Sequence, residues 1–160
     1  MMTDKAVLKR LQELEDKEAI RDVIARYADA VDHNGDKALL KSCFTPDMVW
    51  TSKKIGTWKG RNAVVNELHR VCTVQIPWAL HYMTQAQVTV ARNGESAKAH
   101  YYLWELAKFR ASPGADPNST WIGGWYDSTF RKDKGEWRFS KIILTIRLLS
   151  EARLPEWNTL

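Results

Sequence analysis

The sequence predicts an α+β fold in which a curved antiparallel sheet carries helices on one face. Apolar residues recur with a helical period through the first half of the chain, and the period changes to two after Pro77. No repeat, low-complexity tract or long linker divides the 160 residues. We therefore expect one domain over residues 1–160, with its core at about 14–149.

Three helices are expected before Pro77. The first runs from Leu11 to His33, because its apolar residues keep helical spacing and Asn34-Gly35 follows as a stop signal. A shorter apolar stripe upstream makes residues 1–13 a helical extension, either as a separate helix or as a continuation of the first. The second helix spans Asp36 to Phe44, and the third begins at Gly60.

Alternating apolar residues predict two short strands and four long ones. The predicted strands are Met48–Thr51, Ile55–Trp58, Leu80–Arg92, Ser96–Phe109, Trp121–Arg131 and Glu136–Leu149. Asn93-Gly94 and Lys134-Gly135 are hairpin turn signals, and 111–119 is a longer loop.

A two-residue turn at Asn93-Gly94 sets a register for the hairpin around it. The expected cross-strand pairs are Arg92 with Glu95, His81 with Leu106, Met83 with Trp104, and Gln87 with His100. This register puts His81 and Trp104 on one face of the sheet, and it leaves His100 about 20 Å from His81 at ~3.3 Å per residue. A bulge in the strand would change these pairs.

Composition excludes several classes of function. Lys and Arg number 24 against 19 Asp and Glu, and they are spread along the chain, so nucleic acid is not an expected partner. No apolar run approaches the ~20 residues of a membrane span, and the N-terminus lacks a signal-peptide core, so we expect a cytoplasmic protein. Cys43 and Cys72 have no metal-site or disulfide spacing, and no phosphate-binding glycine motif is present. We therefore expect no metal and no cofactor.

Several short motifs occur in an order typical of one superfamily. They are Leu14-Glu15-Asp16-Lys17-Glu18-Ala19-Ile20-Arg21-Asp22, Tyr27-Ala28-Asp29-Ala30-Val31-Asp32, Trp58-Lys59-Gly60-Arg61, Leu80-His81-Tyr82 and Gly135-Glu136-Trp137-Arg138-Phe139-Ser140-Lys141. In this order they resemble the SnoaL-like branch of the nuclear transport factor 2-like superfamily. The resemblance implies a cone-shaped α+β barrel with a strongly curved antiparallel sheet and N-terminal helices packed over its concave face.

Within that superfamily the pattern is most similar to the cofactor-free lyases: the hexachlorocyclohexane dehydrochlorinase, scytalone dehydratase and bile acid 7α-dehydratase families. The resemblance implies a catalytic pair formed by Asp32, at the end of the first helix, and His81, early in the first long strand. It also implies that Tyr27 takes part, as a tyrosine five residues before the aspartate does in the bile acid enzymes.

The residues themselves agree with this assignment. Asp32 shares a flank of the first helix with Ala25 and Ala28, where the absence of bulk leaves room for a cavity. A carboxylate beside His81 would fix the tautomer of the ring and stabilise the imidazolium that forms when it takes a proton. Tyr27 is either a hydrogen-bond donor to the reacting oxygen or a core tyrosine.

Eight tryptophans are many for a chain of this length. Each one alone could be a core residue, but together they suggest an aromatic wall around a hydrophobic small molecule. The expected substrate-binding residues are Trp50, Trp58, Trp104, Trp125 and Met83, and Trp121 is a further candidate.

These observations predict a cofactor-independent lyase of the dehydratase or elimination type, acting on an aromatic or polycyclic small molecule. The alternatives are an isomerase of the ketosteroid isomerase type, a non-catalytic partner resembling the β subunit of aromatic-ring-hydroxylating dioxygenases, and a small-molecule binding protein. Family precedent implies a homodimer or homotrimer, formed through the outer sheet face or the C-terminal segment from Leu148 to Leu160. That tail contains the apolar segment Leu154-Pro155-Glu156-Trp157.

Overall fold

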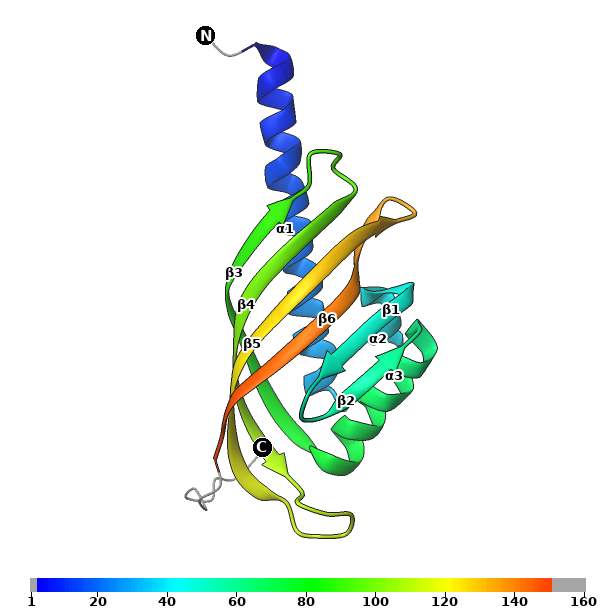
Figure 1. The fold of residues 1–160 in the computed structure, drawn as a ribbon, viewed down its shortest axis with the longest axis vertical. Coiled ribbons are helices and arrows are strands. Elements are labelled where there is room, and N and C mark those ends of the chain that lie inside the picture. The colour runs from blue at the N-terminus through cyan, green and yellow to red at the C-terminus, as the bar shows by residue number, and fades with distance from the viewer. Residues whose placement is uncertain (1–2, 151–160) are drawn as a thin grey trace.

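The structure is a computed structural model that describes residues 3–150, in which a six-stranded sheet is covered by helices on one face (Figure 1). The elements are α1 (Asp4–Asp32), α2 (Lys37–Cys43), β1 (Phe44–Ser52), β2 (Gly56–Lys59), α3 (Arg61–Arg70), a π-helical turn (Val71–Gln75), β3 (Trp78–Val90), β4 (Ser96–Phe109), β5 (Asn118–Asp133) and β6 (Glu136–Leu149). The predicted α+β class is confirmed. The expectations for the C-terminal tail at 151–160 lie outside the described residues.

The strands lie in the order β2-β1-β6-β5-β4-β3. Every neighbouring pair is antiparallel except β1 and β6, which run parallel, with Trp50 beside Ile142. The expectation of a wholly antiparallel sheet is therefore wrong at this one pair. Strand β1 follows α1 and α2 in the chain, and it enters the sheet beside β6, which is distant in sequence. The sheet does not close: β2 and β3 form its edges, and it curls around α1 and α3 (Figure 1).

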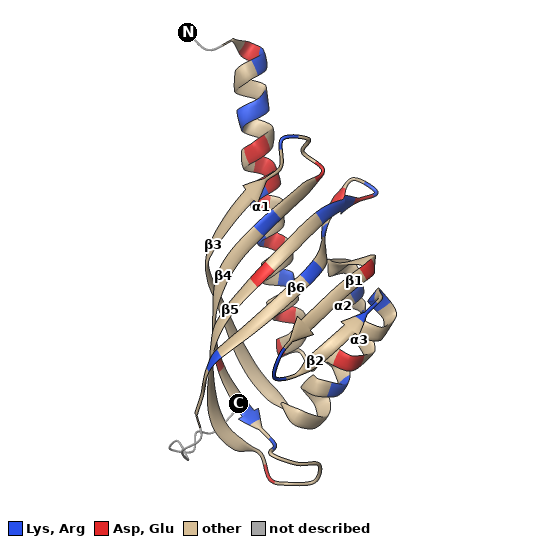
Figure 2. Cartoon of the chain, viewed as in Figure 1, with Lys and Arg blue, Asp and Glu red and all other residues tan. Residues whose placement is uncertain are grey.

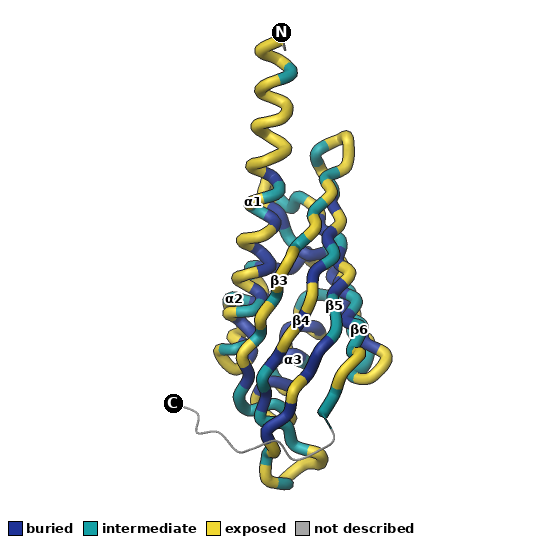
Figure 3. The backbone as a smooth tube through the Cα atoms, turned by 90° about the vertical axis from the view of Figure 1, so that its left-hand side faces the viewer, coloured by how far each residue is buried: buried dark blue, intermediate teal, exposed yellow. Residues whose placement is uncertain are grey.

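Helix α1 is continuous over 29 residues, so the upstream apolar stripe belongs to the same helix. Its first three turns extend beyond the sheet and are exposed (Figure 3). The helix meets the sheet at Asp16, which is buried and accepts a 2.8 Å hydrogen bond from Trp137 Nε1. Lys132 Nζ lies 3.1 Å from the same carboxylate, so the buried charge is paired where α1 first contacts the sheet.

Aromatic side chains fill the core between the helices and the concave face of the sheet. Tyr27 packs against Phe44 and Phe139, with ring centroids 5.9 and 5.5 Å apart. Phe130 continues the cluster at 4.4 Å from Phe139. These large rings fix the distance between α1 and the sheet, and so position the end of the helix against β3.

A β-bulge in β3 changes the register of the β3–β4 hairpin. Near the turn Gln87 pairs with His100, as predicted, but the register shifts by one residue between Thr84 and Gln87, where Gln85 has a φ of 57°. Beyond the bulge His81 pairs with Glu105, so the predicted pairing of His81 with Leu106 is wrong. Trp104 likewise pairs with Tyr82 instead of Met83.

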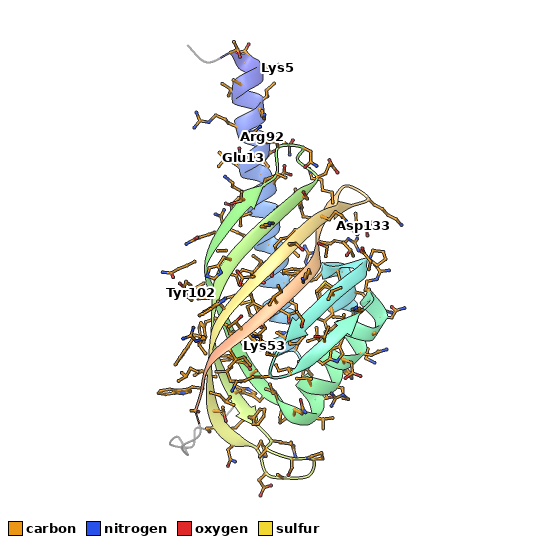
Figure 4. The ribbon with its side chains drawn as sticks, viewed as in Figure 1. Lys5, Glu13, Lys53, Arg92, Tyr102 and Asp133 are labelled. Atoms are coloured by element: carbon orange, nitrogen blue, oxygen red, sulfur yellow. The ribbon has the colours of Figure 1, made fainter. Side chains whose placement is uncertain are left out.

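Because a one-residue shift exchanges the two faces of a strand, the bulge directs His81 to the concave face, while Trp104 lies on the convex face by the regular alternation of β4. The expectation that they share a face is therefore wrong. Large apolar side chains, between 39% and 50% exposed, line this convex face: Leu80, Tyr82, Tyr102, Trp104, Trp121 and Leu148. We call these six residues the convex patch. Figure 4 labels one of them, Tyr102, whose side chain points away from the sheet.

Charged residues are distributed over the whole of the described chain. Basic and acidic positions alternate along α1 and recur on the strands (Figure 2). None of the helices within residues 3–150 combines the length and apolarity needed to cross a membrane.

Candidate active site

Asp32 and His81 form a hydrogen-bonded pair where the C-terminal end of α1 meets β3. His81 Nδ1 lies 2.6 Å from Asp32 Oδ1. The backbone N–H of His81 also donates to the two carboxylate oxygens, at 3.2 and 3.1 Å. A carboxylate at a helix C-terminus faces the negative end of the helix dipole, so these donors stabilise it there. The contact with Asp32 places the hydrogen of the neutral ring on Nδ1. The other ring nitrogen, Nε2, lies on the concave side of the sheet.

Glu105, which no sequence motif pointed to, is the third member of this group. It lies on β4 directly across from His81, and its Oε2 is 3.3 Å from His81 Nε2. Glu105 is only 4% exposed, and its Oε1 has no hydrogen-bond partner among the described residues. Nε2 is therefore not free, as a simple Asp-His pair would leave it, but shares a buried space with a second carboxyl group.

The charges in this group shift the pKa values of two members. Burial raises the pKa of Glu105, and the Asp32 carboxylate raises it further, although His81 opposes the shift. For His81, burial lowers the pKa, but the carboxylates of Glu105 and Asp32 outweigh it, so the pKa is raised above its ordinary value of 6.5. Both groups therefore keep a proton to a higher pH than they would in water.

This raised pKa predicts a pH dependence of stability. A proton held more tightly in the folded state stabilises the fold fully below 6.5, and this stabilisation is lost as the pH rises through the folded pKa of His81. The wild-type protein should therefore lose more free energy of unfolding than His81→Gln as the pH rises above 6.5. Denaturant unfolding of both proteins across that pH range measures the difference. Equal slopes for both proteins would contradict the assignment.

A cavity of about 40 Å³ lies beside His81 and Glu105, between the helices and the concave face. Tyr27, Trp50 and Trp58 all line it. Trp50 Nε1 donates a 3.1 Å hydrogen bond to the Tyr27 hydroxyl, and the Trp50 ring stacks on Trp58 at 4.8 Å. The rest of the lining is mainly apolar, with Val31, Ile55, Leu68, Val71, Cys72, Ile76, Ala79, Tyr126 and Leu144. This volume has room for only a few water molecules, so a substrate needs lining side chains such as half-buried Trp58 to move.

A wider groove of about 690 Å³ lies between α1 and β3, on the other side of His81. It runs beside Ala25 and Ala28, the positions whose small side chains predicted free space, and Met83 lines its strand side. Its volume falls in the range of ~300–1,000 Å³ typical of small-molecule sites. His81 therefore borders both an open groove and a closed apolar cavity.

Trp104 and Trp125 lie away from this region. Both project from the convex face, Trp104 beside Trp121 at 5.6 Å and Trp125 under the guanidinium of Arg147 at 5.3 Å. The expectation that these tryptophans wall the same pocket as His81 is therefore wrong. The alternation of the strands places them outward once Glu105 points inward.

The remaining histidines have other partners. His100 is on the convex face, with Nδ1 2.8 Å from Asp127 Oδ1. His69 Nδ1 lies 3.1 Å from the Asn34 carbonyl oxygen and so ties α3 to the end of α1. Within residues 3–150, no group of three His, Cys, Asp or Glu side chains has the arrangement of a metal site.

Known structures resemble this fold over nearly its whole length. A hexachlorocyclohexane dehydrochlorinase from Novosphingobium barchaimii matches with a TM-score of 0.80 and 22% identity, over 94% of this chain and 98% of that one. A scytalone dehydratase-like protein from Novosphingobium aromaticivorans matches with a TM-score of 0.74 and 17% identity, over 92% and 94%. An NTF2-like protein with a cystatin-like fold from Novosphingobium aromaticivorans has 26% identity and a TM-score of 0.70, over 92% of each chain.

The sequence itself also identifies the family. A comparison with the sequences of curated proteins gives no match. The family model described as the SnoaL-like domain matches residues 12–143, which include most of α1, all three members of the His81 group and most of β6. The chain therefore belongs to the SnoaL-like domain family.

Proposed function

We propose that the protein is a cofactor-independent lyase that eliminates a leaving group from a hydrophobic small molecule. The observation that carries this proposal is the hydrogen-bonded Asp32–His81 pair, in which His81 lines a mainly apolar cavity together with Trp50 and Trp58. Two of the similar structures, the dehydrochlorinase and the scytalone dehydratase-like protein, bear names of elimination enzymes and support the same reaction class.

In this reaction His81 Nε2 takes a proton from a substrate carbon next to an activating group such as a carbonyl. Asp32 holds the ring through Nδ1 and stabilises the imidazolium that forms. Tyr27 donates its hydroxyl hydrogen to the oxygen on which negative charge develops; its own oxygen already accepts from Trp50. Burial raises the pKa of Tyr27 far above its ordinary value, so the hydroxyl keeps its hydrogen at working pH.

The lining residues favour a flat, hydrophobic substrate. The stacked pair Trp50–Trp58 offers an aromatic wall, and the groove beside Ala25 and Met83 can hold the part of the substrate that remains outside. Entry into the cavity requires Trp58, on the edge strand β2, to swing away from Trp50.

A panel of aryl β-hydroxy and β-chloro ketones tests the proposal by the mass of the product. Loss of water or hydrogen chloride, abolished in His81→Gln, supports a lyase. A product of unchanged mass indicates an isomerase instead. A ligand recovered unaltered with wild type and variant alike indicates a binding protein, and co-purification of a larger iron-containing chain from the native source indicates a dioxygenase subunit.

We also propose that the protein forms a homodimer or homotrimer through the convex patch. Six large side chains exposed on neighbouring strands are more than a monomer ordinarily leaves uncovered. Sedimentation velocity should give a multiple of the chain mass for the wild type and for Lys53→Glu, which changes a surface residue on the β1–β2 turn. Trp104→Glu should dissociate the oligomer. A monomeric wild type would contradict this proposal.

A further inference from the structure

We propose that Glu105 is the acid that protonates the leaving group, and that the leaving group is therefore a hydroxyl rather than a halide. This inference rests on the proposed function and assigns a role to a residue that the Asp32–His81 pair leaves unexplained. The first observation is a missing hydrogen bond at the Glu105 carboxyl group. Glu105 lines the cavity, and its Oε1 is buried without a partner among the described residues, whereas buried carboxyl oxygens are almost always paired.

The surroundings of Glu105 favour its neutral form. The cavity around it is mostly apolar, and Asp32 already supplies one negative charge on the far side of His81. The other ionisable groups at the cavity, Tyr27, Tyr126 and Cys72, are all neutral at working pH, because burial raises the pKa of each. Among the residues that line the cavity, His81 is the one that can carry a positive charge, so no cation in the lining stabilises the Glu105 carboxylate when His81 is neutral.

The two carboxyl oxygens then divide their tasks. Oε2 stays 3.3 Å from His81 Nε2, within reach of proton exchange between the two groups. Oε1, buried and without a partner among the described residues, can donate a hydrogen to a substrate hydroxyl in the cavity that Glu105 lines. A substrate bound this way gives Oε1 the partner that it lacks.

The resulting step is balanced without any co-reactant. His81 Nε2 takes the proton from the α-carbon, the C–H electron pair forms the new C=C bond, and the C–O bond breaks. The departing oxygen takes the Glu105 proton and leaves as water. The imidazolium then passes its new proton to the Glu105 carboxylate, which restores both groups.

This geometry limits the substrate. A hydroxide ion is a poor leaving group and needs the proton, whereas chloride leaves as a stable anion and gains nothing from an acid. Because His81 and Glu105 lie side by side on neighbouring strands, the proton and the hydroxyl leave from the same face of the substrate. The chemistry thus fits a β-hydroxy carbonyl compound with a hydrophobic body.

Two probes with one carbon skeleton test this role: 4-hydroxy-4-phenylbutan-2-one and its 4-chloro analogue, which both yield the same conjugated enone. Elimination is followed by enone absorbance above the uncatalysed rate. Glu105→Gln preserves the shape but cannot transfer a proton, so it should lower kcat/KM for the hydroxy probe by roughly 100-fold or more. It should leave the chloro probe within a few fold of the wild type. His81→Gln should lower both, and Glu136→Gln, at an exposed glutamate, should change neither.

An equal loss on both probes, or no loss on either, would overturn the acid role of Glu105. Infrared difference spectra of wild type against Glu105→Gln provide a test that needs no turnover. The proposal requires the carbonyl stretch of a protonated carboxylic acid at neutral pH, and its absence would overturn it. If the wild type acts on neither probe, the proposed lyase function fails for this class, while the infrared result still decides the state of Glu105.

Discussion

Replacing His81 with glutamine is expected to slow turnover of the true substrate by about 10³-fold or more, while the fold is retained. Glutamine can still hydrogen-bond to Asp32, but it cannot accept a proton from carbon. The measurement is kcat/KM for any substrate that the ketone panel identifies, with thermal unfolding as a check on the fold.

His100→Gln is the matched control for this experiment. His100 also pairs with a carboxylate, Asp127, at 2.8 Å, but it lies on the convex face away from the cavity. We expect its turnover to equal that of the wild type. Retained turnover in His81→Gln, or an equal loss in both variants, would remove His81 as the base.

Gly124→Ala is expected to destabilise the fold by about 3 kcal/mol or more, the upper part of the range for overpacked positions. A Cβ at this position would overlap the carbonyl oxygen of Thr145 on the neighbouring strand, and a backbone atom cannot rotate away as a side chain can. The register of β5 and β6 shifts at this point, which brings the two backbones unusually close. Denaturant unfolding measures the loss.

Its neighbour Gly123 provides the control. A Cβ there would lie 3.3 Å from Leu148 Cβ and 3.4 Å from the Trp104 ring, and both of those side chains can shift. Gly123→Ala should therefore cost about 1 kcal/mol or less. If the two variants were equally stable, the close backbone approach at Gly124 would not constrain the sheet.

The local signals in the sequence predicted most of the elements. Helical periodicity placed α1, and Asn34-Gly35 ended it one residue from the observed end at Asp32. The Asn93-Gly94 turn correctly set the register as far as Gln87. The parallel pairing of β1 with β6 was missed, because the two strands are far apart in the sequence and no local pattern records which edge a strand joins.

The candidate site was harder to predict, because it depends on the bulge at Gln85. No glycine or proline marks that bulge, and its left-handed backbone is carried by glutamine. On β4 the outward residues Tyr102, Trp104 and Leu106 are as apolar as the inward ones, so alternation could not show which face is buried. One signal did exist: Glu105 is a charged residue within an apolar strand, which is costly unless it is paired or functional.

The most direct test of the central claim, that His81 takes a proton from carbon, is hydrogen exchange on a substrate without a leaving group. 4-Phenylbutan-2-one is incubated with the protein in D₂O, and deuterium entering next to its carbonyl is followed by NMR. We expect exchange well above the buffer rate with the wild type and with His100→Gln, and exchange at the buffer rate with His81→Gln. Exchange that persists in His81→Gln, or none with the wild type, would contradict the account.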